Sequence, residues 1–455
     1  MILVVVVLGG GLFLIFGWSR TVDLNSGVAT ILEVPEAEVP EEIVLDNGIR
    51  DIENQPQLAN PPEIIKAVYA TGWSAGSTKK QDYLIDLINK TELNAVVVDV
   101  KDFSGYISYR IDNDEIESTG ALDEPRIARP NAMIKKFHDN GIYVIARISV
   151  FQDPILAVAR PEWALKNGTS TELWRDNKGL AWMDAASKPV WDYNILIAQD
   201  VFRRGFDEVN FDYIRFPSDG DLDAIRYPFW DETTPLHLVI RDFFKYLREN
   251  LERDIISVDL FGLTTVDKGD LGIGQTIEDA FLYFDYVAPM VYPSHYAPWT
   301  FGYQKPALEP YGVVGKSLEG ALYRLMDFGS QEVVLSGSGT STVTSTILAT
   351  EKLSKFRPWL QDFDLGAEYT AERVRDQILA LNDVFCGRGL HFPTTQEGTS
   401  PVKSPDGDRG VGLEPIPFTR GEECDFSSSK YGDYYNGWML WDPTNVYTKG
   451  ALAYD

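Results

Sequence analysis

The sequence is poor in the residues that bind transition metals. It contains two cysteines, Cys386 and Cys424, and four histidines, none in a C-x-x-C, H-x-H or H-E-x-x-H arrangement. Zinc sites are built from thiolates and imidazoles at such spacings, so we expect no metal site of this kind and no cofactor. The first strand-like segment leads into "ATGWSAGS", which lacks the G-x-G-x-x-G spacing of a dinucleotide site. We expect no G-x-S-x-G nucleophile elbow, and the serine-rich stretch "SGSGTS" has no strand–helix frame for one.

Basic residues are also scarce relative to acidic ones. The chain has 41 Lys and Arg against 68 Asp and Glu, a net charge of -27. Nucleic acids and anionic membrane surfaces need a basic footprint, so the sequence predicts no nucleic-acid partner and no basic membrane-binding patch. A carbohydrate polymer is compatible with this charge. The 11 tryptophans and 22 tyrosines suit stacking on sugar rings, although core packing explains any one of them equally well.

The first 19 residues carry no charged side chain, and Arg20 follows them. About 20 apolar residues span a bilayer, so residues 1–19 predict a single-pass transmembrane signal anchor, with a cleaved signal peptide as the alternative. Arg20 alone would place the body in the cytoplasm by the positive-inside rule. A basic leader upstream of the assigned start would reverse this orientation. We expect an extracytoplasmic body, anchored or secreted, behind an acidic, proline-containing linker over residues 20–60.

From residue 61 to 455 the chain alternates strand-like and helix-like segments. Near-continuous apolar runs predict strands over 66–73, 94–102, 142–151, 206–216, 254–262, 285–293, 355–365 and 435–443. Helical spacing predicts helices over 79–91, 129–141, 190–205, 235–251, 311–329 and 371–385. Eight strands with intervening helices indicate an α/β fold of the (β/α)8 TIM-barrel class; an open doubly wound sheet is the alternative.

Two segments interrupt this alternation. Residues 331–347 are rich in Ser, Thr and Gly, and residues 386–424 are rich in Gly and Pro and are bracketed by the two cysteines. We interpret both as loop insertions. A Cys386–Cys424 disulfide would constrain the second loop and would suit an oxidising compartment, whereas two free thiols are the alternative.

The candidate site follows from the barrel, since functional residues of this fold lie where strands end. Five strands end in carboxylates: Asp99, Asp212, Asp259, Asp362 and Asp442. The two-residue period of strands puts Glu208, Asn210 and Asp212 on one face. Asp212 then lies at the rim, and Glu208, roughly 13 Å away along the strand, belongs to a structural network at the floor.

Paired carboxyl groups of this kind predict glycoside hydrolysis, which needs one protonated and one ionised group. Asp212 is the expected nucleophile or general base and Asp259 the expected acid, while Asp99 or Asp362 as partner would suit inversion. The predicted substrate-binding residues are Lys101, Asp102, Arg147, Arg215, Tyr292, Trp359, Gln361 and Trp441. A divalent cation bound by Asp99, Asp102 and Asp212 is a weaker alternative.

Four motifs in order carry a family resemblance: "NAVVVDVKDFSGYISY", "GFDEVNFDYIRFP", "FRPWLQDF" and "GWMLWDP". Together they resemble a bacterial TIM-barrel domain family catalogued as "putative glycoside hydrolases", over about residues 65–452. The resemblance implies a barrel related to known glycosidases and often tethered behind a signal or membrane segment. It implies no substrate and no catalytic pair. The sequence thus predicts a glycosidase of a cell-envelope or environmental polysaccharide; a non-catalytic glycan-binding or envelope-organising barrel is the alternative.

Overall fold

The computed structural model of the chain describes residues 51–330, 332–335, 343–346, 353–388 and 425–453. The predicted anchor, residues 1–19, and most of the predicted linker lie outside these ranges. Among the helices of the described ranges, none combines the length and apolar character needed to cross a membrane.

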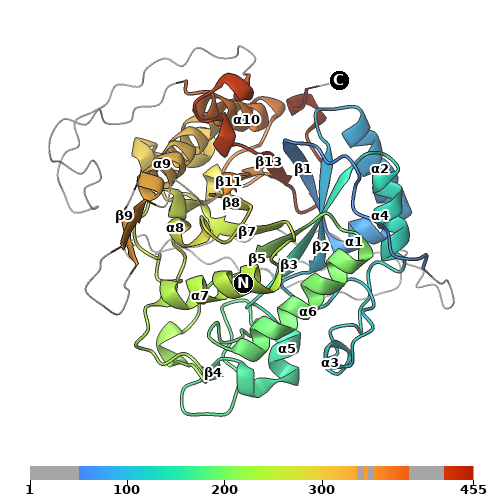
Figure 1. Cartoon of the computed structure of the whole chain (residues 1–455), viewed down its shortest axis with the longest axis vertical. Coiled ribbons are helices and arrows are strands. Elements are labelled where there is room, and N and C mark those ends of the chain that lie inside the picture. The colour runs from blue at the N-terminus through green and yellow to red at the C-terminus, as the bar shows by residue number, and fades with distance from the viewer. Residues whose placement is uncertain (1–50, 331, 336–342, 347–352, 389–424, 454–455) are drawn as a thin grey trace, which may run out of the picture. The chain divides into compact units, whose positions relative to one another are not determined.

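Eight parallel strands close into a barrel, seen at the centre of Figure 1. In chain order they are β1 (Ile65–Ala70), β2 (Ala95–Lys101), β3 (Tyr143–Ser149), β5 (Glu208–Asp212), β7 (Ile256–Phe261), β8 (Tyr286–Met290), β12 (Trp359–Gln361) and β13 (Gly437–Trp441). A short strand, β11 (Lys355–Phe356), also pairs with β8. Pairing of β8 with both β7 and β12, and of β13 with β1, completes the ring. The predicted TIM-barrel fold is therefore confirmed.

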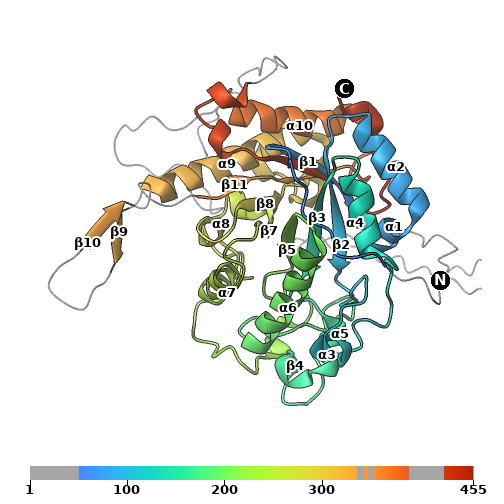
Figure 2. The ribbon, with the colours of Figure 1, turned by 45° about the vertical axis from the view of Figure 1, so that its right-hand side comes forward.

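Helices surround the strands in Figure 1. The main ones are α2 (Thr78–Asn89), α4 (Pro130–His138), α6 (Lys188–Arg204), α7 (Leu236–Asn250), α8 (Ile277–Ala280), α9 (Pro310–Ser330) and α10 (Ala371–Phe385). Figure 2 shows α9 and α10 side by side along one flank. Helix α6 ends at Gly205, whose φ of 100° is the left-handed conformation that glycine adopts at low cost.

The connections that follow the strands carry smaller elements. These are α1 (Gly72–Gly76), α3 (Asp114–Glu117), α5 (Pro154–Ala159), η1 (Pro161–Trp163), β4 (Lys166–Asn167), η2 (Leu222–Ala224), β6 (Ile225–Arg226), η3 (Gly262–Thr265), η4 (Pro293–His295), η5 (Thr300–Gly302), η6 (Pro306–Leu308) and η10 (Lys449–Ala451). Two more 3-10 turns, η8 (Phe426–Ser428) and η9 (Gly432–Tyr434), precede β13.

The two predicted insertions have different outcomes. Residues 331–347 contain an antiparallel pair, β9 (Glu332–Leu335) and β10 (Val343–Thr346), which loop composition did not predict. Most of residues 386–424 lies outside the described ranges, as does Cys424. The Cys386–Cys424 disulfide therefore stays a prediction.

Strand β5 shows how the sequence pattern sorts side chains between the barrel interior and the helices. Val209 and Phe211 are fully buried in the large apolar cluster beneath the helices. Glu208, Asn210 and Asp212 point the other way and contact polar groups of other strands. The alternation of the sequence thus predicts the orientation of each side chain correctly.

The barrel floor is polar where an apolar layer is usual for this fold. Glu208 forms a fully buried ion pair with Arg357 and accepts hydrogen bonds from Ser257 (2.5 Å) and Tyr143 (3.3 Å). The predicted structural role of Glu208 is therefore confirmed. Above this layer, Ala67, Val97, Ile145, Trp359 and Met439 fill the barrel as a second apolar cluster.

Residues 51–60, the end of the predicted linker, are bound to the barrel. Asp51 accepts hydrogen bonds from the backbone amides of Asn131 (2.8 Å) and Ala132 (3.1 Å) in the first turn of α4. Further along, the Leu58 amide donates to Asp207 (2.6 Å), and the Leu58 side chain packs against the apolar cluster inside the barrel. Composition alone predicted a solvated tether over these residues. The contacts of Asp51 and Leu58 instead hold residues 51–60, called the strap below, against the barrel.

Candidate active site

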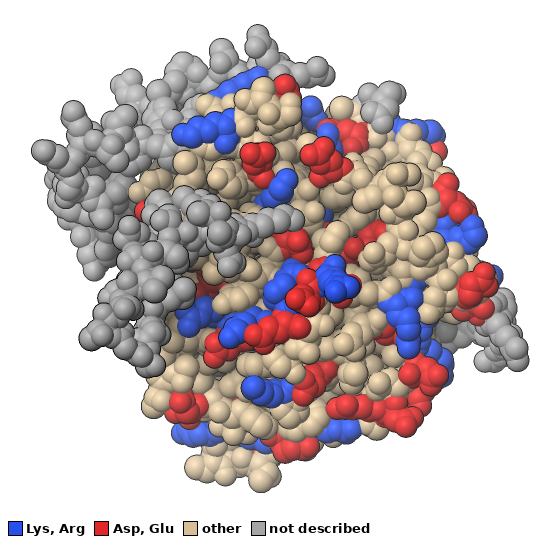
Figure 3. Space-filling view, viewed as in Figure 1, with Lys and Arg blue, Asp and Glu red and all other residues tan. Residues whose placement is uncertain are grey.

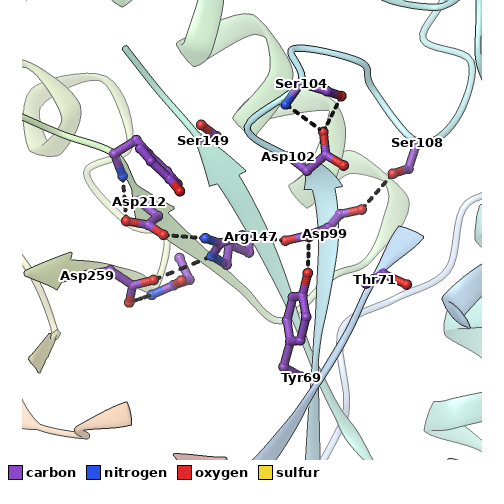
Figure 4. Close-up of polar contacts among 12 residues, drawn as sticks. Tyr69, Thr71, Asp99, Asp102, Ser104, Ser108, Arg147, Ser149, Asp212 and Asp259 are labelled. Atoms are coloured by element: carbon purple, nitrogen blue, oxygen red, sulfur yellow. Dashed lines mark hydrogen bonds and ion pairs between the residues drawn. The ribbon is translucent and has the colours of Figure 1, made fainter. Parts of the chain in front are cut away.

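Arg147 on β3 organises the carboxylates at the barrel mouth (Figure 4). Its Nη1 donates to Asp99 at 2.7 Å, its Nη2 forms an ion pair with Asp212, and its Nε lies 3.6 Å from Asp259 Oδ2. All four side chains are at most 8% exposed. Burial lowers the pKa of the Arg147 guanidinium, but the charges of Asp212 and Asp99 outweigh burial and raise this pKa overall. The cluster is therefore held by one cation shared among three acids.

Asp259 is the member whose surroundings favour the neutral form. Its Oδ1 accepts hydrogen bonds from Asn210 Nδ2 and Trp359 Nε1, both at 2.8 Å, whereas its buried Oδ2 has no hydrogen-bond partner among the residues that the structure describes. Burial, and then the charge of Asp212, raise the pKa of Asp259 to about 8. A carboxyl group with a pKa raised in this way favours the protonated form at neutral pH.

Asp212 is bound through both of its carboxyl oxygens. Besides the ion pair with Arg147, its Oδ1 accepts the backbone N–H of Tyr213 at 2.5 Å. Tyr213 has a φ of 53°, in the left-handed region that side chains other than glycine rarely adopt. This strained turn directly after β5 aims the amide at the carboxylate.

Asp99 completes the cluster on the opposite side of Arg147 and is linked to a pair of aromatic rings. It accepts the Tyr69 hydroxyl at 2.5 Å, and burial raises the pKa of Asp99. The Tyr69 ring stacks on Trp441 with 3.8 Å between ring centres, and the Arg147 guanidinium lies 4.9 Å from the Trp441 ring centre. Trp441 is partly exposed, and its ring lies beside the charged groups of the cluster.

Residues 67–390 match the family described as "Putative glycosyl hydrolase domain". The chain belongs to this family. The match covers more than two thirds of the chain and confirms the resemblance inferred from the motifs. No curated protein matches the chain.

Several solved structures are similar to this member of the glycosyl hydrolase family. A hypothetical protein from Ruminiclostridium thermocellum ATCC 27405 is 38% identical over 42% of this chain and 96% of its own, with a TM-score of 0.39. The PgaB (BpsB) glycoside hydrolase domain from Bordetella bronchiseptica is 14% identical over 71% of this chain and 92% of its own, with a TM-score of 0.49. An α-galactosidase from Thermus thermophilus is 13% identical over 72% of this chain and 58% of its own, with a TM-score of 0.40.

Several predicted site residues of this chain lie outside the Arg147 cluster. Lys101 is fully buried against Asp153 (2.8 Å) and Asn194 of α6 (3.0 Å). Arg215 forms no ion pair with a described carboxylate; its guanidinium lies among the Trp182, Tyr213 and Phe261 rings, 4.7 to 5.4 Å from their centres. Gln361 is fully buried and hydrogen-bonded to the Ser294 amide and the Phe363 carbonyl. Arg147, rather than Lys101 or Arg215, is thus the cation that contacts Asp212.

Two of the predicted rim carboxylates, Asp362 after β12 and Asp442 after β13, bind the connection after β13 rather than Arg147. Asp362 accepts the Thr448 amide at 2.8 Å, and burial raises the pKa of Asp362 to about 7. Asp442 accepts the Thr444 amide at 2.8 Å and organises the turn after β13. The remaining predicted binding residues flank the cluster: Trp359 donates to Asp259, and the charge of Asp259 acts on Tyr292, whose pKa is raised chiefly by burial.

The oxygen-only cation site has its ligands engaged elsewhere. Asp102 forms an ion pair with Arg126 and accepts Ser104 Oγ at 2.5 Å, while Asp99 and Asp212 are both bound to Arg147. Figure 4 shows Asp102 turned toward Ser104 and away from Arg147. Across the described ranges, no group of three or more acidic, His or Cys side chains is arranged to bind a metal ion.

The expected absence of a G-x-S-x-G motif is wrong, because residues 72–76 match it. It follows β1 directly, where a nucleophile elbow is expected. However, Ser74 lies in helix α1, is 8% exposed and does not have the positive φ of a strained elbow. Close packing explains both glycines, since a Cβ at Gly72 would meet Ser108 Oγ at 2.2 Å and one at Gly76 would meet the Arg126 carbonyl at 1.9 Å.

Proposed function

We propose that the chain is a glycosidase that cleaves a cell-envelope or environmental polysaccharide, with Asp212 as nucleophile or general base and Asp259 as general acid. One observation carries the assignment: two buried carboxyl groups lie on neighbouring strands, Asp212 in an ion pair with Arg147 and Asp259 with a pKa raised by burial and by the charge of Asp212. Such a pair is the usual basis of acid and base roles in a single site.

The strand pairing supports a functional distance between the two groups. Phe211 of β5 pairs with Val258 of β7, so Asp212 and Asp259 are the next residues along adjacent parallel strands about 4.8 Å apart. Because the guanidinium nitrogens of Arg147 are about 2.3 Å apart, the oxygens of Asp212 and Asp259 that face them are separated by at most about 8.5 Å. This lies within the range of glycosidase carboxyl pairs.

In the proposed reaction, Asp259 transfers its proton to the glycosidic oxygen as the bond to the anomeric carbon breaks. Asp212 either attacks that carbon or removes a proton from the attacking water. Arg147 binds Asp212 through an ion pair, and the Tyr213 amide fixes the orientation of the carboxyl group. Trp441 offers a flat face for the sugar ring beside these groups.

A non-catalytic glycan-binding barrel is the second candidate, and burial favours it. Asp99, Arg147, Asp212 and Asp259 are 1–5% exposed, so the closed site leaves little surface for a substrate. In this reading the Arg147 cluster stabilises the barrel, and sugars bind at the rim.

Hydrolysis of a polysaccharide panel and of nitrophenyl glycosides separates the two candidates. We expect turnover by the parent protein, loss of turnover on all substrates in Asp212→Asn, and a decrease of about 10²- to 10⁴-fold on polysaccharide in Asp259→Asn. Nitrophenolate leaves without a proton, so Asp259→Asn should retain much of its activity on nitrophenyl glycosides. Asp223→Asn, at an exposed position in η2, is the matched control. Equal glycan binding and no turnover by all four proteins would establish the non-catalytic barrel.

We also propose that residues 1–19 anchor the chain with its body outside the cytoplasm. The uncharged apolar sequence of this segment is the basis. Expression of the full chain and of a form lacking residues 1–19 tests it: the full chain should sediment with membranes and be cut by external protease, and the shortened form should do neither.

A further inference from the structure

The exposed apolar side chains of this protein gather at one end of the barrel. In the described part of the chain, every large apolar side chain that is exposed lies in a connection that follows a barrel strand: Phe103, Val158, Leu222, Phe229, Leu263, Trp299, Leu308 and Val446. The outer helices α2, α4, α6, α7, α9 and α10 contribute none. These connections form the end at which Asp212 and Asp259 lie, which is the functional end of such barrels.

Trp299 is the most exposed of these residues, at 66%. It belongs to the connection from β8 to α9, which begins near Tyr292, a residue on which the charge of Asp259 acts. In the described residues, its indole stacks on no other ring or cation. A large aromatic ring left in water at a functional rim is a feature that core packing does not explain.

The backbone holds Trp299 in a strained conformation. Its φ and ψ are 72° and 0°, and Phe301, two residues later, has 57° and 16°. Both lie in the left-handed region, which costs free energy for side chains other than glycine and persists only where the surroundings enforce it. The sequence therefore retains a tryptophan where glycine would be more stable.

Neighbouring contacts enforce this loop and make it rigid. The Trp299 amide donates to the Tyr303 carbonyl at 2.7 Å, and the Gly302 amide donates back to the Trp299 carbonyl at 2.9 Å. Lys316 of α9 donates to the Phe301 carbonyl at 3.2 Å, and the Phe301 ring packs on buried Tyr296, with 5.7 Å between ring centres. A ring presented on a fixed backbone loses little conformational entropy when a ligand stacks on it.

We propose that Trp299 is an outer sugar-binding platform that stacks on a ring of a polymeric neutral glycan, beyond the residue whose bond is cleaved. This rests on the proposed glycosidase function and adds a substrate class, an extended chain rather than a short glycoside. The net charge of -27 disfavours polyanions. Acidic and basic side chains are interspersed on the face shown in Figure 3, so neither sign of charge dominates there. A ligand without charge is compatible with such a face.

Affinity electrophoresis in soluble starch, β-glucan, galactomannan and xylan tests the platform, with Asp212→Asn as the parent so that no polymer is degraded. We expect Trp299→Ala to weaken binding of the retained polymer by about tenfold, from loss of one stacked apolar face. Trp299→Phe should recover part of this loss. Leu308→Ala is the matched control, because it removes an exposed side chain of the same connection (42% exposed) that is not a flat ring, and its affinity should be unchanged.

Trp299→Gly separates the ring from the strain. It should bind as weakly as Trp299→Ala while unfolding at an equal or higher temperature, because glycine relieves the left-handed strain. In an otherwise unmutated chain, Trp299→Ala should hydrolyse nitrophenyl glycosides at the unmutated rate.

The outcomes distinguish this proposal from the proposed function. Equal polymer affinity of Trp299→Ala and the parent overturns the platform and leaves hydrolysis by the unmutated chain untouched. Loss of binding together with no turnover by the unmutated chain supports the platform and overturns the glycosidase. The platform is also overturned if the parent is a dimer in sedimentation velocity and Trp299→Ala is a monomer, because a second copy of the chain would then cover Trp299. Failure of the parent to bind any polymer of the panel overturns it as well.

Discussion

The protonation of Asp259 makes a quantitative prediction about stability. The pKa of Asp259 rises from an ordinary 3.8 to about 8 on folding, chiefly through burial. Between these two values the folded state holds a proton that the unfolded state has released, so stability must fall as pH rises from about 4 to 8. Each pKa unit corresponds to about 1.36 kcal/mol, so the loss over this window is on the order of 5 kcal/mol.

Asp259→Asn isolates this contribution. The amide keeps an oxygen for the hydrogen bonds from Asn210 and Trp359 and cannot ionise. Urea unfolding at a series of pH values should show a shallower decrease in the free energy of unfolding for the variant than for the parent between pH 5 and 8. Near pH 8 the free energy of unfolding of the variant, relative to that of the parent, should be at its highest.

Two controls make the comparison specific. Asp362 also contributes a downward slope, because its pKa rises to about 7 on burial, and this slope should persist in Asp259→Asn and disappear in Asp362→Asn. Asp223→Asn, at an exposed site, should leave the profile unchanged. Parallel profiles for the parent and Asp259→Asn over pH 5 to 8 would refute the neutral carboxyl and, with it, the acid role.

Three further substitutions follow from the buried contacts. Arg147→Met leaves three buried carboxyl groups without their shared cation and should lower the free energy of unfolding by about 3–5 kcal/mol in urea titrations. Lys101→Met leaves the buried Asp153 without its ion-pair partner and should lower the free energy of unfolding by a similar 3–5 kcal/mol. Because neither residue contacts the Arg147 cluster, kcat of the folded protein should be unchanged. A lower kcat would mean that Lys101 takes part in the site after all. Asp51→Ala removes the hydrogen-bonded cap of α4 and should cost about 1 kcal/mol, whereas no change would mean that the strap contributes nothing.

The sequence predicted the barrel and the Asp212–Asp259 pair for a simple reason. Near-continuous β-branched runs mark strands buried on both faces, and consecutive strands of such a fold are neighbours in space. Two aspartates at equivalent positions of adjacent strands must then lie close together. The period of two along β5 also placed Glu208 at the floor, although the pattern could not reveal that Arg357 is its partner.

Lys101 shows where this logic ends. A regular strand would place Asp99 and Lys101 on the same face, but the pairing of β2 with β3 shifts register between them. This β-bulge turns Lys101 toward α6, where Asp153 and Asn194 bind it. A bulge depends on the partner strand, so the sequence of β2 alone does not reveal it.

Arg215 departs from the prediction for a related reason. It was predicted to bind substrate at the rim, since it lies just beyond Asp212 at the end of the predicted strand. The left-handed turn at Tyr213 ends the strand, so the alternation of β5 cannot be extended to Arg215. The side chain packs among aromatic rings, and the cation that binds Asp212 comes from β3, a contact that only the closed barrel creates.

Burial has two opposing consequences for catalysis in this barrel. It raises the pKa of Asp259 to about 8, which makes the group an acid, and it leaves Asp259 only 1% exposed, which keeps substrate away. If the barrel mouth opens to admit a sugar, water reaches Asp259 and lowers its pKa. The bound sugar must then exclude this water and raise the pKa again. The alkaline limb of kcat/KM reports the free enzyme and that of kcat the enzyme–substrate complex. Activity should fall on the alkaline side in both profiles, with the kcat limb at the higher pH. If the alkaline limb of kcat lay at a lower pH than that of kcat/KM, the pKa of Asp259 would be lower in the enzyme–substrate complex than in the free enzyme. Bound substrate would then hydrate Asp259, which contradicts a site that works by excluding water.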